Sequence, residues 1–124
     1  MGVEFKLTKE VPADKPNVAV LHLGGWLDIQ SENALVEAVR NAKDEGAEYV
    51  LLELSDLDTV TSAGIRGIQR AFGVMTPGHD ESMIGRLTLC SAPPQVYQVL
   101  KITGVLISTP MYESQDIALG SFGK

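Results

Sequence analysis

The stretch 49–75 changes its hydrophobic period, and this change limits the fold more than any other feature of the chain. Residues Tyr49–Leu54 form an almost unbroken apolar, β-favouring run, which is typical of a strand buried on both faces. From Ile65 onward, apolar side chains recur at three- and four-residue steps, which indicates one face of a helix. The stretch therefore predicts a strand, a turn and a helix, with the hydroxyls of Thr61 and Ser62 at the helix N-terminus.

The residues on either side of this turn complete the unit. Ser55–Thr61 is polar and acidic, so we expect it to form a loop at the carboxyl end of the strand. The helix is predicted to run from about Ser62 to Met75 and to bury one apolar face, formed by Ile65, Ile68 and Phe72.

The N-terminal part of the chain predicts a β-hairpin. Residues Gly2–Glu10 alternate between apolar and polar side chains, as in a half-exposed edge strand. Residues Val18–Leu23 form a more continuous apolar run, and the glycines that follow are expected to end this second strand. The connection of the two strands through Val11–Asn17 is short enough for antiparallel pairing.

The segment after the hairpin predicts an amphipathic helix. Ser31 suits the N-cap position, and the helix is expected to run to about Glu45. Its apolar side chains recur with helical spacing, and Gly46 suits the position that follows the last turn. The charged side chains, Glu32 among them, are interpreted as a solvent-exposed face and not as a site.

The C-terminal part continues the alternation of strands and helices. Arg86–Cys90 is a further buried strand, and Ala92–Pro94 can open a helix that Gly104 stops. Val105–Ser108 is predicted as a last short strand, and Ser114 as the N-cap of a closing helix. Helices that alternate with apolar strands favour an α/β fold whose strands are parallel and joined by right-handed crossovers.

The residues from Asp56-Leu57 to Ser62-Ala63-Gly64-Ile65-Arg66 resemble the D-L-x-x-x-x-S-A-G-[IL]-R signature of the STAS domain. This is the domain of bacterial anti-sigma factor antagonists, and it also occurs at the cytoplasmic end of sulfate transporters. The resemblance extends from Gly25–Asp28 to Ile102–Val105. It implies one STAS domain over residues 1–124, with a mixed sheet of about five strands and about four helices. The N-terminal strand would be antiparallel at the edge and the others mainly parallel.

The resemblance also implies a function. In the family, the serine at the position of Ser62 is phosphorylated by an anti-sigma factor that is itself a serine kinase, and the unphosphorylated protein binds that factor and so releases the sigma factor. The implied function is therefore an anti-sigma factor antagonist whose binding is switched by phosphorylation of Ser62. The family commonly has Asp immediately before this serine, whereas this chain has Thr61. Thr61 is thus an alternative phosphate acceptor.

A partner-binding surface is expected around the acceptor serine. The N-terminus of a helix accepts a phosphate well, and a four-residue spacing brings Arg66 close to Ser62. In the family, a Gly-x-Leu-Asp segment lies beside the phosphorylation loop, which places Asp28 there; a loop carboxylate that helps to start the next helix is the alternative. The predicted surface consists of Asp28, Asp56, Asp58, Thr61, Ser62, Gly64 and Arg66. Helix capping is the purely structural alternative for Thr61 and Ser62.

Charge and composition limit the partners. The formal net charge is −6 and no cluster of Lys and Arg occurs, which argues against binding to nucleic acid or to an anionic membrane surface. No secretory leader and no run of about 18 apolar residues is present. We therefore expect a cytoplasmic protein without membrane insertion. The single cysteine, Cys90, lies in an apolar run and is expected to be buried rather than reactive.

Other functions fit the sequence less well. Ser62, His22 and Asp28 are the residue types of a catalytic triad, but Val60–Gly64 lacks the first glycine of a G-x-S-x-G elbow, so no enzymatic activity is predicted. The adjacent residues His79–Glu81 have poor geometry for a metal, and neither metal nor cofactor is expected. A further alternative is a STAS scaffold that oligomerises, as a homodimer for example, or docks to a transporter or sensor complex with Ser62 unmodified.

Overall fold

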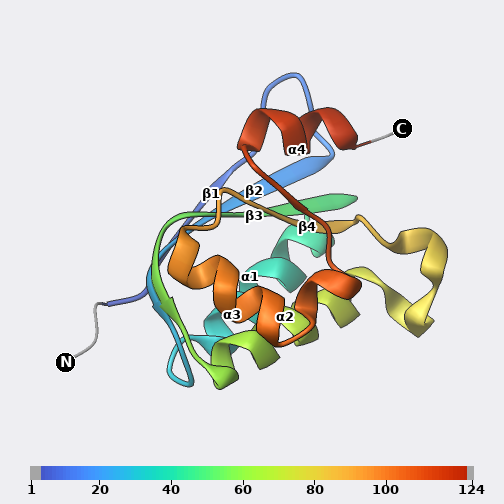
Figure 1. Ribbon diagram of the computed structural model, residues 1–124. Helices are drawn as coiled ribbons and strands as arrows, with labels where there is room; N and C mark the ends of the chain where they lie inside the picture. Colours follow the sequence, from blue (N-terminus) through green and yellow to red (C-terminus); the bar gives the residue numbers. More distant parts are fainter. Residues whose placement is uncertain (1–3, 123–124) are drawn as a thin grey trace.

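The structure is a computed structural model, which describes residues 4–122 except for the side chain of His79 (Figure 1). The strands are β1 (Lys6–Glu10), β2 (Val18–Leu27), β3 (Tyr49–Val60), β4 (Leu87–Cys90) and β5 (Met111–Tyr112). The helices are α1 (Glu32–Asp44), α2 (Ser62–Met75), α3 (Pro94–Ile102) and α4 (Gln115–Ser121). Short 3-10 turns are formed by η1 (Pro77–His79), η2 (Glu81–Met83) and η3 (Val105–Ile107).

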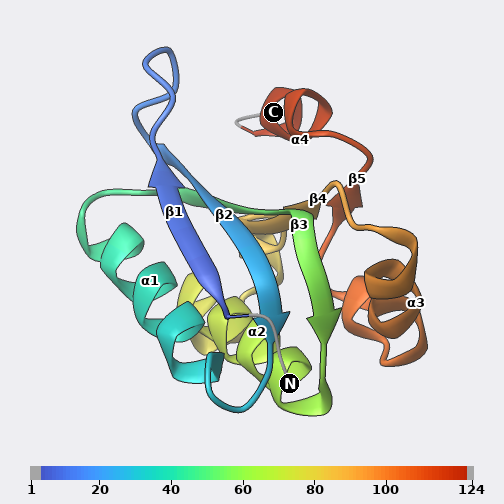
Figure 2. The same ribbon diagram turned by 90° about the vertical axis from the view of Figure 1, so that its left-hand side faces the viewer.

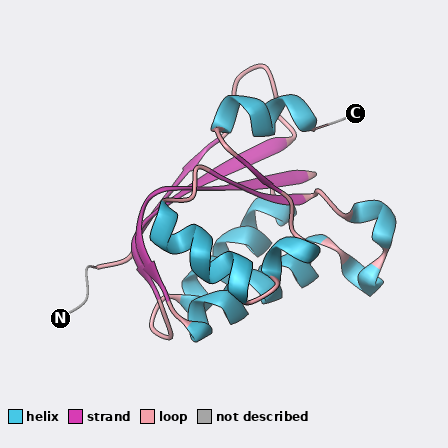
Figure 3. Cartoon of the chain, in the orientation of Figure 1, coloured by secondary structure: helices cyan, strands magenta, loops and turns pink. Residues whose placement is uncertain are grey.

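The strands form one five-stranded sheet in the order β1-β2-β3-β4-β5. The pairing of β1 with β2 is antiparallel, and all other pairings are parallel. Helices α1, α2 and α3 lie against one face of the sheet, and α4 lies against the other (Figures 1 and 3). These features confirm the predicted fold class, including the antiparallel strand at the edge.

Two groups of apolar side chains hold these layers together. The larger group lies between the sheet and the three helices, and its side chains include Leu21, Leu35, Leu52, Ile68, Leu89 and Leu100, each fully buried. The smaller group lies at the α4 side and consists of Val18, Val20, Leu51, Cys90 and Ala118. Because β2, β3 and β4 contribute to both groups, they are buried on both faces, as their nearly continuous apolar sequences predict.

Strands β2 and β3 are longer than the sequence predicts. The prediction that the second strand ends at the glycines is wrong, as is the prediction of a loop over Ser55–Thr61. Gly24 pairs with Asp56 and Leu27 pairs with Val60, with one register shift between these pairs and another just before Gly24. The polar residues of this part of β3 are tolerated because they lie at the surface, whereas Leu57 and Val60 between them are buried.

The predicted strand over Val105–Ser108 is also wrong. Gly104 adopts a left-handed conformation, with φ of 80°, and ends α3. The residues that follow then close the 3-10 turn η3 by local bonds, such as that from Ile107 N to Gly104 O. The last strand lies further along the chain, where Pro110 O accepts from Leu89 N of β4.

Helix α2 begins and ends where the sequence predicts, and Ile65 and Ile68 are buried. Phe72 is only half-buried, although it packs against the core. The fully buried positions of the last turns are instead held by Ala71 and Met75. The prediction of the buried face is therefore correct for the isoleucines and only partly correct for Phe72.

Candidate functional site

Helices α1 and α2 begin side by side, at the end of the sheet where β2 and β3 finish (Figures 1 and 2). Two contacts join the start of α2 to the end of β2. Thr61 N donates a hydrogen bond of 3.0 Å to Leu27 O, and the backbone of Gly64 lies directly against the same carbonyl. A Cβ atom on Gly64 would lie only 2.2 Å from Leu27 O. Gly64 is buried, and because it has no side chain, α2 can pack closely on β2.

The two hydroxyls at the start of α2 have different environments. Thr61 is the N-cap residue, with φ of −100° and ψ of 178°, and its Oγ1 accepts a long bond of 3.4 Å from Gly64 N. Ser62 is the first helical residue and is exposed. Within residues 4–122, no group hydrogen bonds to Ser62 Oγ. Capping therefore accounts for Thr61 and leaves the hydroxyl of Ser62 free.

The connection between β2 and α1 is closed by its own polar groups. Asp28 Oδ1 accepts from the backbone N–H groups of Gln30 and Ser31, at 3.0 and 3.3 Å. The hydroxyl of Ser31 donates to Trp26 O and accepts from Asp28 N. Ser31 occupies the N-cap position but makes no capping bond, so the predicted capping role of its side chain is wrong. Asp28 has the role that was expected as its alternative, a carboxylate that helps to start the next helix.

The other two predicted acidic residues lie on strand β3. Asp56 and Asp58 are both exposed. The indole Nε1 of Trp26 donates to Asp58 Oδ2 at 2.9 Å, and Gln95 Nε2 of α3 donates to Asp58 O at 3.2 Å. Asp58 thereby links β2, β3 and the first turn of α3, close to the turn that carries the two hydroxyls.

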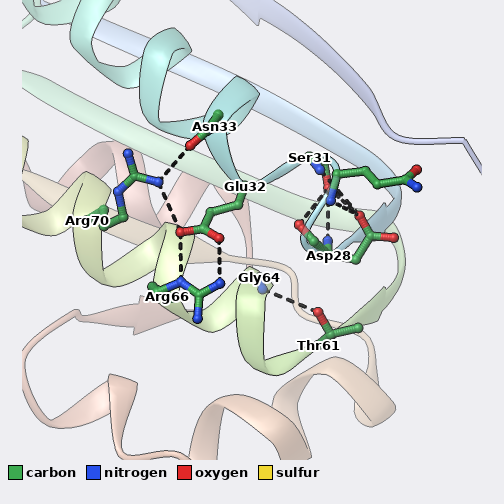
Figure 4. A network of polar contacts seen from close by, with 9 residues as sticks. Asp28, Ser31, Glu32, Asn33, Thr61, Gly64, Arg66 and Arg70 are labelled. Atoms are coloured by element: carbon green, nitrogen blue, oxygen red, sulfur yellow. Dashed lines mark hydrogen bonds and ion pairs between the residues drawn. The ribbon is translucent and has the colours of Figure 1, made fainter.

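Within residues 4–122 no hydrogen bond joins Arg66 to Ser62; instead Arg66 forms an ion pair with Glu32 of α1 (Figure 4). Its Nε and Nη2 atoms donate to the two carboxylate oxygens of Glu32, both at 2.9 Å. Arg70 Nη1 donates to the same carboxylate at 3.0 Å and to Asn33 Oδ1 at 2.8 Å. We call Glu32, Asn33, Arg66 and Arg70 the Glu32 cluster. The interpretation of Glu32 as part of a solvent-exposed face is therefore wrong, because only 7% of it is exposed.

The charges of the Glu32 cluster affect one another. Hydrogen bonds from Arg66, and then from Arg70, hold the pKa of the Glu32 carboxyl below its ordinary value. The pKa of Arg66 is raised in turn by its bonds to Glu32. At neutral pH the cluster therefore contains one carboxylate and two guanidinium groups. Sequence spacing indicates that Arg66 and Arg70 share a helix face, but it gives no sign of a partner 34 residues earlier.

The three residues whose types match a catalytic triad, Ser62, His22 and Asp28, are not joined by hydrogen bonds within residues 4–122. His22 Nε2 lies 2.9 Å from Glu10 Oε1, and its Nδ1 lies 3.8 Å from Glu53 Oε1. These contacts place the imidazole among the strands of the sheet, and the bonds of Asp28 are made within its own loop. Cys90 is buried as predicted, and burial raises the pKa of its thiol to about 11.

With this geometry established, comparison with known proteins decides the family. The sequence-family model of the STAS domain matches residues 11–118 of this chain. The chain belongs to the STAS domain family.

Among curated proteins, this STAS domain is similar to "Putative anti-sigma factor antagonist BtrV" of Bordetella bronchiseptica. The two are 32% identical over 79 residues, which is 64% of this chain and 64% of that protein. The match thus spans less than two thirds of the relative.

Solved structures share the fold of this STAS domain. An anti-sigma factor antagonist from Mycobacterium paratuberculosis superimposes with a TM-score of 0.80 at 16% identity, over 98% of this chain and 96% of the other. The anti-sigma factor antagonist SpoIIAA in its unphosphorylated form gives 0.70 at 19% identity, over 94% and 93%. The phosphorylated form of SpoIIAA from Bacillus gives 0.64 at 18% identity, over 94% and 97%. At these identities the likeness establishes the fold.

Neither a metal-binding group nor a membrane-spanning helix is found in the described part of this STAS domain, residues 4–122. No three side chains of His, Cys, Asp or Glu there are grouped so that they could hold a metal ion. In the same residues, no helix has both the length and the apolar character that crossing a bilayer requires.

Proposed function

We propose that this STAS domain is an anti-sigma factor antagonist and acts as a phosphorylation-switched protein-binding module in the cytoplasm. With Ser62 unphosphorylated, it binds an anti-sigma factor of the serine-kinase type and so frees the sigma factor. The name of its Bordetella relative supports the class of function. The unconnected positions of Ser62, His22 and Asp28 support a binding module over a hydrolase.

The observation that carries the proposal is the free hydroxyl of Ser62. It lies exposed at the first position of α2, and Thr61 already supplies the cap. A kinase can therefore reach the Ser62 oxygen without breaking a bond within the described structure. Phosphorylation of Thr61 would instead remove the cap, which contributes about 1 kcal/mol to stability. This difference favours Ser62 over Thr61 as the acceptor.

A phosphate at this position would change the surface and not the fold. It adds roughly −1.5 to −2 charges at a helix N-terminus, where an anion is stabilised by the helix dipole. SpoIIAA shares the fold and has been solved with and without its phosphate. In this chain the added charge would join the proposed partner-binding surface, which includes Asp28, Asp56 and Asp58. A partner that contacts this surface would meet a stronger negative potential and an extra group to desolvate.

The test is to purify the bound partner from the native host and to measure both its affinity and its kinase activity. Ser62→Ala is expected to bind the partner and to accept no phosphate. Ser62→Asp is expected to lose about 2–5 kcal/mol of binding, or roughly thirty- to several thousand-fold in affinity. Because an anion suits a helix N-terminus, its melting temperature should hardly change.

Thr61→Ala is the matched control for the second hydroxyl. It is expected to lower stability by about 1 kcal/mol and to leave phosphate incorporation intact. Incorporation that is lost in Thr61→Ala and kept in Ser62→Ala would make Thr61 the acceptor. Equal partner affinity of Ser62→Asp and wild type, in folded protein, would instead support a scaffold that binds without a phosphorylation switch.

A further inference from the structure

The Glu32 cluster has more positive charge than its internal pairing needs. Its single carboxylate is shared by two arginines, so the cluster has a formal charge of +1 on a chain whose net charge is −6. The side chain of Glu32 is only 9% exposed, whereas those of Arg66 and Arg70 are 54% and 44% exposed. The carboxylate is thus closed off from solvent, and both guanidinium groups remain accessible to a further anion.

The second arginine allows the first one to leave. A buried carboxylate that loses its only cation is strongly destabilised. In this cluster, Arg70 Nη1 already donates to Glu32 Oε2 and is oriented by Asn33. If Arg66 moves away, the charge of Glu32 is still neutralised by Arg70. No such exchange would be available to a single Glu–Arg pair.

Arg66 is also within reach of Ser62. Residues four apart on a helix have Cβ atoms roughly 5–6 Å apart, and long helical side chains lean towards the helix N-terminus. Ser62 is therefore on the part of the surface that the Arg66 side chain can cover by rotation about its own bonds. A planar guanidinium that binds a carboxylate through two N–H groups can bind a phosphate in the same way.

We propose that the Glu32 cluster is a phosphate-binding site in reserve, in which Arg66 transfers from Glu32 to a phosphate on Ser62 while Arg70 retains Glu32. This inference rests on the proposed function, because it takes Ser62 as the site of phosphorylation. Before the transfer the cluster presents two exposed arginines to a partner. After it, one arginine binds the phosphate and the other remains with Glu32, so the modification removes a basic contact as well as adding an acidic group.

The charged groups near Ser62 are of both signs. Asp28, between β2 and α1, and Asp56 and Asp58, on β3, are negative and would raise the pKa of a nearby phosphate. On α1, Glu32 is a further negative group. On α2, Arg66 and Arg70 are the basic groups, and on α3 the first turn contributes the neutral Gln95. The N-terminus of α2 also stabilises the phosphate dianion, so contact with Arg66 is reported by the part of the pKa lowering that Arg66→Gln removes.

The experiment places phosphoserine at position 62 by genetic encoding, so that neither a kinase nor a partner is needed. The second pKa of the phosphate, about 6 in free phosphoserine, is measured by ³¹P NMR, and the Arg66 Nε–H resonance is followed with and without the phosphate. In the wild-type background the phosphate pKa is expected to fall by roughly half a unit to one unit. The Arg66 resonance is expected to shift.

The variants separate the roles of the three charged residues. Arg66→Gln should raise the phosphate pKa well above its wild-type value, and Glu32→Gln should leave that pKa unchanged or lower it further. Arg70→Gln should raise the phosphate pKa in the same way, because Arg66 is then retained by Glu32. Arg70→Lys should return it to the wild-type value. The control is Arg40→Gln, which removes an arginine paired with Glu37 elsewhere on α1 and should change nothing. Thermal melts followed by circular dichroism establish that each variant is folded.

Three results would overturn the proposal: a phosphate pKa that is unchanged in Arg66→Gln, an Arg66 resonance that ignores the phosphate, or a resonance shift that persists in Arg70→Gln. The last result would show that Arg70 acts only through its distant charge. Any of them would leave the proposed binding function intact. A purified partner that transfers no phosphate to Ser62 would defeat the proposed phosphorylation switch without altering this titration.

Discussion

The start of α2 should be intolerant of any side chain at Gly64, and Gly64→Ala tests this directly. The added Cβ atom would lie 2.2 Å from Leu27 O, 2.9 Å from Leu27 C and 2.8 Å from Val60 Cγ2. Two of these atoms belong to the backbone of β2 and cannot rotate away. The helix must therefore move by about 1 Å to restore van der Waals separation, and this movement stretches the bond from Thr61 N to Leu27 O.

The expected loss follows from three contributions. Overpacking costs about 1–3 kcal/mol, and a weakened backbone hydrogen bond costs about 0.5–1.5 kcal/mol. Replacing glycine by alanine in a helix returns up to about 1 kcal/mol. The free energy of unfolding of Gly64→Ala should therefore be about 0.5–4.5 kcal/mol lower than that of the wild type.

The same helix provides the control. Gly73 is exposed, and an added Cβ would have nothing within 4 Å, so Gly73→Ala should be more stable than wild type by about 0.5–1 kcal/mol. Gly67 is intermediate, with Glu32 Cγ at 3.3 Å from the added atom. Urea denaturation followed by circular dichroism measures all three. A Gly64→Ala protein as stable as Gly73→Ala would refute the close packing of α2 on β2.

Three further predictions concern the core, the thiol and the Glu32 cluster. Ile68→Ala should lower the free energy of unfolding by about 2–5 kcal/mol. This loss should exceed that of Phe72→Ala, because Ile68 is fully buried and Phe72 is only half-buried. The reverse order in urea denaturation would show that the helix is rotated. Cys90, whose pKa is raised to about 11 by burial, should react with a thiol reagent at pH 8 at least ~100-fold more slowly in the native protein than in the urea-unfolded chain; equal rates would contradict its burial. Because the pKa of Glu32 is lowered in the folded state, its ion pairs stabilise the fold at pH values above the ordinary pKa of 4.5, and this stabilisation is lost as the pH falls through the folded-state pKa. The melting temperature of the wild type should thus fall more steeply below pH 4.5 than that of Glu32→Gln. Parallel curves would show that the ion pairs do not form.

The limits of sequence-based prediction are clearest along β3. Its first half is apolar and was predicted correctly, whereas Ser55–Val60 resembles a loop because polar and acidic residues predominate. Its strand conformation is stabilised by pairing with Gly24–Leu27 of β2, which lies about thirty residues earlier. Similarly, the apolar segment Val105–Ser108 has the composition of a strand, but strand β5 forms further along, where the chain reaches β4.

The candidate site divides in the same way. The strand-turn-helix unit, the extent of α2 and the two hydroxyls at its N-terminus are predictable from the sequence, because helix periodicity depends on neighbours within a few residues. The three-dimensional arrangement was needed to learn that Thr61 caps the helix while Ser62 remains free, and that Gly64 packs against β2. The pairing of Arg66 with Glu32 also appears only in three dimensions. Contacts between residues far apart in the chain depend on how the sheet brings two helix N-termini together, and no local sequence pattern records this.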